Sequence, residues 1–572
     1  MRRLLGSSLG LVLAVLAAGS APAQPAAPRK AAKPEPAATA AEATGSEADT
    51  AAQAAATPPA TASFPPDALK LNLSDAIEKG LEKNLDIQVQ RFAPYIAEER
   101  LREAWGAYDP TFAAQLGYSF ANQPVASPFQ FSGSITQRLT DGSAGLDGIL
   151  PWLGTGYSVD YLGQRLLSDS AVAGFSPELD AALGFTLTQP LLKNLIWNQP
   201  WTQVKSSRIA SAEEEENFRR QVMDTVRDIE TAYWGVIAAS EQLRVAQVSL
   251  ETSNALLGQT RTQYEVGVVS KVEVTEAEAG VAEREVNLIT AKNAYRASQD
   301  NLINLVLGTD LTATSTLEIE PTDRPATTVT YAVDEEEATK KAFERRPEIA
   351  LAHQEIERQV VQLQFAKNQK LPELDVRTTY GYQGLSGEVN PAALPLRNSL
   401  CSLPGSDCPP LPEPDRNFWD ANHFFDGRNG MNWSTRGLFS IPLGNRAADA
   451  REAQAELLLA RARSAERRLG QNIVLEVRAA VRDLRSAQEG IVAAERRRLA
   501  AAEQLRAERI RLENGESTPF DVLQRERDLV DAESQKIAAE KIYRDSVTGL
   551  DRAQGTILET RNIRVEDVRA LR

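Results

Sequence analysis

Two copies of one turn motif set the organisation of this chain. Residues 512–524 read LENGESTPFDVLQ, and residues 264–276 read YEVGVVSKVEVTE. Both copies place a glycine, a hydroxyl residue and an acid at the same offsets, namely Gly267, Ser270 and Glu273 against Gly515, Thr518 and Asp521. Glycine permits the backbone angles of a tight turn, and Ser or Thr three residues before an acid fits the capping box that begins a helix. Each copy therefore predicts a turn followed at once by a new helix.

The residues before each turn repeat every seven positions. The apolar row in the first half is Val222, Ile229, Val236, Leu243, Leu250, Leu257 and Tyr264, and a small residue follows three positions after each of the first six. The second half carries Val477, Leu484, Ile491, Leu505 and Leu512, interrupted by Arg498. A strict seven-residue repeat predicts a left-handed supercoil of closely packed helices. We expect long helices over 199–264 and 447–512, each about 100 Å in length, and medium helices near 271–307 and 519–556.

The turns belong to a duplication of nearly the whole chain. The stretch SDAIEKGLEKNLDI (74–87) corresponds to EEATKKAFERRPEI (336–349), and TQPL (188–191) corresponds to SIPL (440–443). Pre-strand helices are expected near 86–108 and 348–371, and with the medium helices they match the length of a long helix. Each half is thus expected to form two parallel helical columns. We place the first repeat at 71–320, the second at 331–560 and a C-terminal tail at 561–572.

The regions between the helices alternate in polarity. In TFAAQLGYSF (111–120), Phe112, Leu116 and Tyr118 share one face and small or polar residues share the other. Three further stretches, LGFTLTQP (183–190), LDVRTTYGYQ (374–383) and NWSTRGLFSIP (432–442), read similarly. This alternation fits a soluble sandwich or an outer-membrane barrel. About four strands per chain are clear, which is too few to close a barrel, so several copies must share one. Alternating pieces within 123–180 allow an extra hairpin, whose side of the membrane the sequence leaves open.

The N-terminus predicts that the mature protein lies outside the cytosol, and the net charge bears on its partners. Two arginines, an apolar run and a small-residue cleavage site predict a signal peptide over 1–23, and an Ala/Pro-rich segment over 24–70 is expected to be flexible. A net charge of −15 argues against a nucleic-acid partner. Beyond the signal peptide no apolar stretch reaches the length of a membrane-spanning helix, so any contact with a membrane is expected through strands.

In this order and spacing, the motifs LSDAIEKGLEKNLDI, AYDPTFAAQLGYSF, YEVGVVSKVEV, SIPLG and LENGESTPFDVL resemble the TolC family of outer-membrane efflux and secretion channels. The resemblance covers about 70–560. It implies an α+β membrane protein with an internal two-fold repeat. Three chains would share a 12-stranded outer-membrane β-barrel, about four strands per chain, continued by a long periplasmic α-helical coiled-coil barrel. The implied partners are outer-membrane lipid, a periplasmic adaptor and an inner-membrane transporter of the RND, ABC or MFS type.

The resemblance also assigns roles to the two turns. The candidate residues of the periplasmic aperture are Asp521, Gln524, Glu273 and Glu276. Gln524 stands where the family often has an acid, and Leu512 and Ser517 stand where the family has the tyrosine and arginine partners of the first-half acid. That latch is therefore expected to be absent, and closure of the aperture is expected to be weaker or to be built from other groups, such as Glu276, Glu513, Glu516 or Arg509. Helix capping alone also explains the two acids.

The same resemblance makes the two turns the docking point for the adaptor. The residues concerned are Gly267, Val268, Ser270, Gly515, Glu516, Ser517 and Thr518. They lie at the exposed ends of paired helices. The expected function is a passive conduit for efflux or type I secretion, and the alternative is a non-conducting spacer anchored in the outer membrane.

The remaining chemistry-bearing residues indicate no enzyme, cofactor or metal site. The sequence lacks a phosphate-binding Gly-rich loop, a G-x-S-x-G elbow and an HExxH motif. Its only cysteines, Cys401 and Cys408, lie in a long loop at about 385–431, and their spacing in a secreted chain favours a loop disulfide over free thiols. His353 and His423 stand alone and are read as structural or exposed.

Overall fold

The computed structural model describes residues 69–125, 133–310, 318–323, 333–402, 418–423 and 430–570. The predicted signal peptide and almost all of the Ala/Pro-rich segment lie outside these residues, as does Cys408. No helix in the described part of the chain combines the length and the apolar character needed to cross a membrane.

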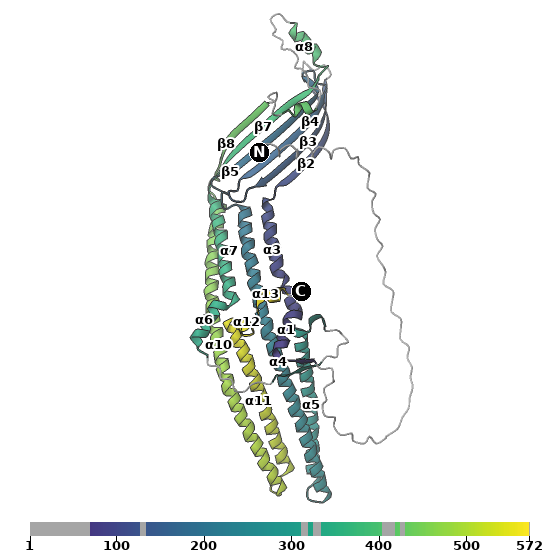
Figure 1. The fold of residues 1–572 in the computed structure, drawn as a ribbon, viewed down its shortest axis with the longest axis vertical. Coiled ribbons are helices and arrows are strands. Elements are labelled where there is room, and N and C mark those ends of the chain that lie inside the picture. Colours follow the sequence, from purple (N-terminus) through teal and green to yellow (C-terminus); the bar gives the residue numbers. More distant parts are fainter. Residues whose placement is uncertain are drawn as a thin grey trace, which may run out of the picture. The chain divides into compact units, whose positions relative to one another are not determined.

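Four helices end at the two turns and carry the largest part of the structure (Figure 1). The long helices are α4 (Gln199–Glu265) and α10 (Arg446–Glu513), of 67 and 68 residues. The medium helices are α5 (Lys271–Val306) and α11 (Pro519–Gln554). These bounds confirm the predicted helices to within one or two residues. Local signals fix them: the Asn198 side chain accepts the Trp201 backbone N–H at 2.8 Å at the start of α4.

Shorter helices precede the strands in each half. The first half has α1 (Leu73–Lys83), α2 (Leu85–Gln90), α3 (Phe92–Trp105) and the 3₁₀ turn η1 (Gly106–Tyr108), and the second has α6 (Glu335–Arg345) and α7 (Pro347–Lys370). Helices α3 and α5 both pack on α4, while α7 and α11 both pack on α10. At the start of α4 the Trp201 ring lies 6.0 Å from that of Trp105 in α3. This arrangement agrees with two columns in each half.

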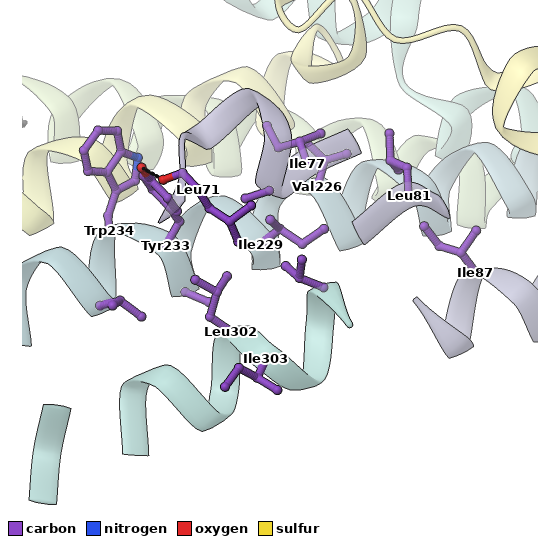
Figure 2. Packing of buried hydrophobic residues seen from close by; sticks show 14 of the residues in the cluster. Leu71, Ile77, Leu81, Ile87, Val226, Ile229, Tyr233, Trp234, Leu302 and Ile303 are labelled. Atoms are coloured by element: carbon purple, nitrogen blue, oxygen red, sulfur yellow. Dashed lines mark hydrogen bonds between the residues drawn. The ribbon is translucent and has the colours of Figure 1, made fainter. Parts of the chain in front are cut away.

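The largest core surrounds the middle of α4 (Figure 2). Val226, Ile229 and Tyr233 of the apolar α4 face are fully buried against α1 and α5, where they meet Ile77 and Leu302. The Tyr233 hydroxyl donates to the Leu71 carbonyl at 3.1 Å, which ties the helix to the short parallel pair β1 (Leu69–Leu71) and β6 (Ile319–Pro321). The turn η2 (Gly308–Asp310) follows α5, and α12 (Ile557–Thr560) and α13 (Val565–Ala570) add to the core from the C-terminal end.

A second core lies in the other half, where α10 packs against α6 and α11. Val477, Val481 and Leu484 of α10 are buried there together with Tyr543 and Leu550 of α11. Val477 and Leu484 belong to the predicted heptad row, so the sequence pattern identifies the packed face in both halves. Arg498, which interrupts that row, instead donates to Glu495 on its own helix at 2.8 Å.

The longer strands of the described residues form one antiparallel sheet of six. Its members are β2 (Thr111–Pro124), β3 (Ser134–Ile149), β4 (Gly156–Ser168), β5 (Phe175–Pro190), β7 (Glu373–Val389) and β8 (Gly430–Ser440), adjacent in that order. The expectation of about four strands is thus corrected to six, because the hairpin suggested by residues 123–180 joins the sheet between β2 and β5. Two short helices, α8 (Leu394–Cys401) and α9 (Phe418–Ala421), belong to the connection between β7 and β8 along the chain.

The sheet has two chemically different faces, since directly paired residues in an antiparallel sheet share a face. One face carries Phe112, Leu116, Tyr118, Leu146, Val159, Tyr161, Leu183, Phe185, Tyr380, Tyr382 and Trp433. The opposite face carries Gln115, Ser119, Asp141, Ser143, Asp160, Gln164, Thr186, Thr379 and Ser434. This is the expected alternation, extended over two more strands.

Candidate functional site

The candidate site consists of the two turns and the helix ends beside them, which we call the first tip (residues 264–276) and the second tip (residues 512–524). Gly267 has a backbone φ of 81° and Gly515 has a φ of 76°. Each glycine N–H bonds to the carbonyl three residues earlier, that of Tyr264 at 2.9 Å and that of Leu512 at 3.1 Å. These φ angles lie in the left-handed region that favours glycine, so the repeated glycine is explained by turn geometry.

The second tip has the complete capping box that the sequence predicts. Thr518 Oγ1 accepts the backbone N–H of Asp521 at 3.3 Å, and the Asp521 carboxylate accepts from the Thr518 hydroxyl at 2.7 Å and from its backbone N–H at 3.4 Å. The hydrogen bond from the Thr518 side chain, followed by that from its backbone, lowers the pKa of Asp521 below its ordinary value. The exposed Asp521 carboxylate is therefore charged at neutral pH.

The first tip differs from this prediction. The Ser270 side chain makes no cap to the backbone of α5, and its hydroxyl instead lies 3.3 Å from Glu273 Oε1. The capping box expected for Ser270 and Glu273 is therefore corrected to a single contact between side chains. Lys271 begins this helix where Pro519 begins α11, so the fixed φ of a proline does not preorganise the first turn.

Apolar contacts hold the second tip against the neighbouring parts of α4, α5 and α10. Leu256 of α4 and Leu505 of α10 pack with Val522 and Leu523 of α11. A Cβ added at Gly280 of α5 would lie 3.3 Å from both methyl carbons of Leu523, so the absence of a side chain lets α5 approach α11 closely. Gly280 was not predicted as a packing residue, although a glycine within a helix can have a packing reason.

Ion pairs bridge the helices next to the tips. Arg261 of α4 lies 2.7 Å from Glu278 of α5, and Arg527 of α11 lies 2.5 Å from Glu283 of α5. Arg509, one of the groups considered for closing the aperture, lies 2.8 Å from Glu526, whose side chain is buried. Within one chain, Arg509 therefore serves the packing of α10 on α11.

The four candidate aperture residues occupy equivalent positions in the two halves. Asp521 and Glu273 lie in the first turns of α11 and α5, and Gln524 and Glu276 follow one turn later. Asp521, Gln524 and Glu276 are exposed, while Glu273 is half-buried. In the part of the chain that the structure describes, no hydrogen bond or ion pair joins the first-tip pair to the second-tip pair. The acids of one chain therefore do not form a closed latch.

The comparisons with known proteins identify the family. The sequence matches the family model "Outer membrane efflux protein" over residues 148–308 and 338–556. The chain belongs to this family. The outer membrane efflux protein described here therefore resides in the outer membrane with a large periplasmic portion, and its family consists of channels and not of enzymes.

Solved structures support the fold independently. The outer-membrane channel OprN matches with a TM-score of 0.60 and 16% identity over 85% of this chain and 90% of that chain. VceC of Vibrio cholerae matches with a TM-score of 0.56 and 16% identity over 84% and 96%. CmeC of Campylobacter jejuni matches with a TM-score of 0.56 and 14% identity over 85% and 86%. At these identities the likeness shows the shared fold alone. No curated protein matches the efflux protein by sequence.

Apolar side chains are exposed on both tips of the efflux protein. Val266 and Val268 of the first tip are 70% and 71% exposed, and Val272 and Phe520 are also exposed. Val268 lies among the predicted docking residues, while the other three were not predicted. The sequence did carry a signal for the valines, because a solvated turn rarely contains as many valines as EVGVVS (265–270).

Two charge clusters that link the halves of the efflux protein were not predicted. In one, Glu230 of α4 is fully buried and meets Thr548 of α11 and Arg561. In the other, Arg552 of α11 donates to Asp224 of α4 at 2.7 Å and to Glu348 of α7 at 2.8 Å. The partners lie more than 200 positions apart in the sequence and share no regular spacing. These contacts could therefore be identified only from the structure.

The structure bears on only some of the other sequence predictions for side-chain chemistry. Cys401 ends α8, but Cys408 lies outside the described residues, and their disulfide stays a prediction. His353 Nε2 lies 3.0 Å from Glu466 Oε1, a surface contact between α7 and α10. Among the described residues no group of three or more His, Cys, Asp or Glu side chains could hold a metal ion.

Proposed function

We propose that three copies of this chain form the exit duct of a tripartite efflux or type I secretion system. The duct conducts substrates passively from an inner-membrane transporter of the RND, ABC or MFS type, through a periplasmic adaptor, to the exterior. The observation that carries this proposal is the direct continuity of strands and long helices within one chain: α3 leads into β2, β5 into α4, α7 into β7, and β8 into α10.

The two faces of the sheet support a conducting barrel over a spacer. A spacer needs an apolar face toward lipid, but the small and polar residues on the opposite face, Gly, Ser, Thr and Asp, add nothing to its function. A water-filled lumen requires such a face, because polar groups that line it stay hydrated. The alternation over all six strands, including Gln115, Ser143 and Thr186, favours the conduit.

The exposed tips are the docking point for the adaptor in this proposal. Exposed Val266, Val268 and Phe520 supply apolar surface, and apolar residues rimmed by polar ones are typical of protein interaction sites. The left-handed glycines hold the turns tight, so an adaptor meets preformed loops. Crosslinks from 267–270 and 515–518 that reach only partners at the strand end of the protein would contradict this role.

Three copies of Asp521 would form a ring of carboxylates at the periplasmic aperture. A ring of acids attracts cations and repels anions. The hydrogen bonds from Thr518 lower the pKa of Asp521 in one chain, which opposes the rise in pKa that neighbouring carboxylates of a ring would cause. One helical turn after Asp521, α11 carries Gln524 and not an acid, so a second acidic ring is not expected from this helix.

Conductance of the purified trimer in a planar lipid bilayer tests the conduit. We expect cation-preferring channels in the wild type and a weaker cation preference in Asp521→Ala. An assembled trimer that conducts neither as wild type nor as Asp521→Ala would favour the non-conducting spacer.

A further inference from the structure

The six-stranded sheet of one chain leaves two strand edges open. The outer strands are β2 and β8, and neither has a second partner among the described strands. Strand β2 spans 14 residues and is exposed along most of its length, and β8 spans 11 residues. In a bilayer the backbone groups of an open edge have no water to bind, so such edges must be paired.

The directions of the strands allow the two edges to meet. All five neighbouring pairs in the sheet are antiparallel. With an even number of strands, the first and last run in opposite directions, so β8 of one copy can pair antiparallel with β2 of the next. A second copy of this chain therefore fits each open edge.

We propose that three copies close into an 18-stranded barrel, with the β3–β4 hairpin of each chain as part of the wall. The trimer itself rests on the proposed function, and the strand number rests on the sheet order of six strands per chain. The pairing is continuous across the hairpin. Residues 111–124 pair with β3 without a break, and β4 pairs with β5 from Gly156 to Leu166.

Glycines and carboxylates fit the hairpin into the polar face of the wall. A Cβ added at Gly117 of β2 would lie 2.5 Å from Oδ1 of Asp141 in β3. A Cβ added at Gly145 of β3 would lie 2.8 Å from Oδ1 of Asp160 in β4. Each aspartate thus lies over a glycine of the neighbouring strand. The opposite side of the hairpin carries Leu146 and Val159, so both faces continue those of the flanking strands.

The hairpin turn is anchored at the helix end of the sheet. Thr155 Oγ1 donates to Gln189 Oε1 at 2.5 Å, and Gln189 Nε2 donates to the Leu153 carbonyl at 3.3 Å. A Cβ at Gly154 would lie 2.6 Å from the Asn194 carbonyl oxygen, which leaves room only for glycine. In the same turn Trp152 is 81% exposed, as is typical of aromatic side chains at the rim of a membrane barrel.

The hairpin widens the barrel without adding helices to the periplasmic tunnel. Four of the six strands connect directly to helices, whereas β3 and β4 are joined by the short turn 150–155. With strands about 4.8 Å apart and tilted by about 40°, 18 strands enclose a backbone diameter of about 36 Å, against about 24 Å for 12 strands. The exit barrel thus suits bulkier cargo than a 12-stranded exit.

Imaging of the trimer in lipid nanodiscs by cryo-electron microscopy tests the strand number. We expect 18 strands in the wild type. A variant in which a short Gly/Ser linker replaces residues 126–174 joins β2 to β5, and it is expected to form 12 strands. A wild-type trimer with 12 strands and the hairpin outside the wall would overturn the proposal while leaving the exit duct intact. Absence of any trimer would overturn both.

Cysteine pairs keep the test decisive if the shortened variant fails to assemble. In trimers in membranes, Gln115→Cys with Ser143→Cys and Ser158→Cys with Thr186→Cys are directly opposite pairs and should form disulfides in most molecules. The matched control is Gln115→Cys with Ala144→Cys, whose side chains lie on opposite faces and should not crosslink. Crosslinking no higher than this control, in assembled trimers, would contradict a hairpin in the wall.

Discussion

Arg561 holds the buried carboxylate of Glu230 in a two-pronged ion pair, with Nη2 donating to Oε2 over 2.9 Å and Nε to Oε1 over 2.5 Å. Glu230 lies in the middle of α4, and Arg561 lies beyond α12, 331 positions later. Thr548 of α11 donates a third hydrogen bond at 2.6 Å. The side chain of Glu230 is fully buried. The C-terminal end of the second repeat is therefore fastened to the long helix of the first by a neutralised buried charge.

Removal of one partner of this pair should destabilise the protein strongly. Arg561→Ala leaves a buried carboxylate without its counter-charge, a change that costs about 3–5 kcal/mol in comparable pairs. We expect a large drop in the thermal midpoint of the detergent-solubilised trimer. The double variant Glu230→Gln with Arg561→Gln removes both charges and should lose less than Arg561→Ala. Equal midpoints for the wild type and Arg561→Ala would show that the pair contributes nothing.

Two carboxylates, one in each charge cluster, predict a particular dependence of stability on pH: Asp551 beside Arg561 and Glu230, and Glu348 beside Arg552. Burial raises the pKa of Asp551 to about 6, against the opposing charge of Arg561. Burial also acts to raise the pKa of Glu348, but the hydrogen bonds and charges of Arg346 and Arg552 outweigh it and lower that pKa to about 2. The two carboxylates therefore act in opposite directions as the pH changes.

For Asp551 the folded state favours the protonated form, so its contribution to stability is lost as the pH rises through about 6. For Glu348 the folded state favours the charged form, so stability is lost as the pH falls from its ordinary pKa toward about 2. We expect the thermal midpoint to rise between pH 7 and pH 5 and to fall below about pH 4. Asp551→Asn should abolish the rise and keep the fall; a rise of full size in that variant would assign it to other groups.

How much of the fold and of the candidate site could be predicted from the sequence depends on how far apart the interacting residues lie along the chain. The ends of α4 and α11 follow from local signals, such as the glycine turns and the Thr518 cap, so their bounds were predicted closely. Strand β3 reads SITQRLTDGSAGLDGI, and its glycines and aspartates hide the alternation that β2 displays clearly. Gly145 of this strand makes room for the Asp160 carboxylate of the next strand, which only the register reveals. The ion pair of Glu230 with Arg561 joins two distant positions and leaves no local trace.

A glycine of the second tip and a glycine within α4 predict opposite effects of alanine substitution. Gly515→Ala forces a side chain into a φ of 76° and should cost the second tip about 1–2 kcal/mol. Gly258→Ala is the matched control, because Gly258 lies within α4 with open space around its Cβ position and should be neutral or stabilising by up to about 1 kcal/mol. Hydrogen exchange of the Glu516 amide, which bonds to the Arg511 carbonyl at 2.8 Å, reports the change. Equal exchange in both variants would refute the role of the turn geometry.

The loop cysteines predict a disulfide that can be tested without a structure. Cys401 and Cys408 should resist labelling by a maleimide in denatured, non-reduced protein and should each take one label after reduction. Cys401→Ser should leave one reactive thiol at Cys408 without reduction. Complete labelling of the unreduced wild type would show free thiols in place of the disulfide.

The two functions assigned to Asp521, capping and aperture charge, can be separated. Thr518→Ala removes the side chain that accepts the Asp521 N–H and should destabilise the start of α11 by about 1 kcal/mol, while the carboxylate remains. Asp521→Asn removes the charge and keeps a polar side chain at the same place. In planar bilayers we expect Asp521→Asn to lower the preference for cations over anions several-fold and Thr518→Ala to leave it nearly unchanged. Asp528 lies two turns after Asp521 in α11 and pairs with Arg525. Asp528→Asn therefore serves as the charge-matched control. If Asp528→Asn lowered the cation preference as much as Asp521→Asn, the effect would belong to the net charge of the helix and not to an aperture ring.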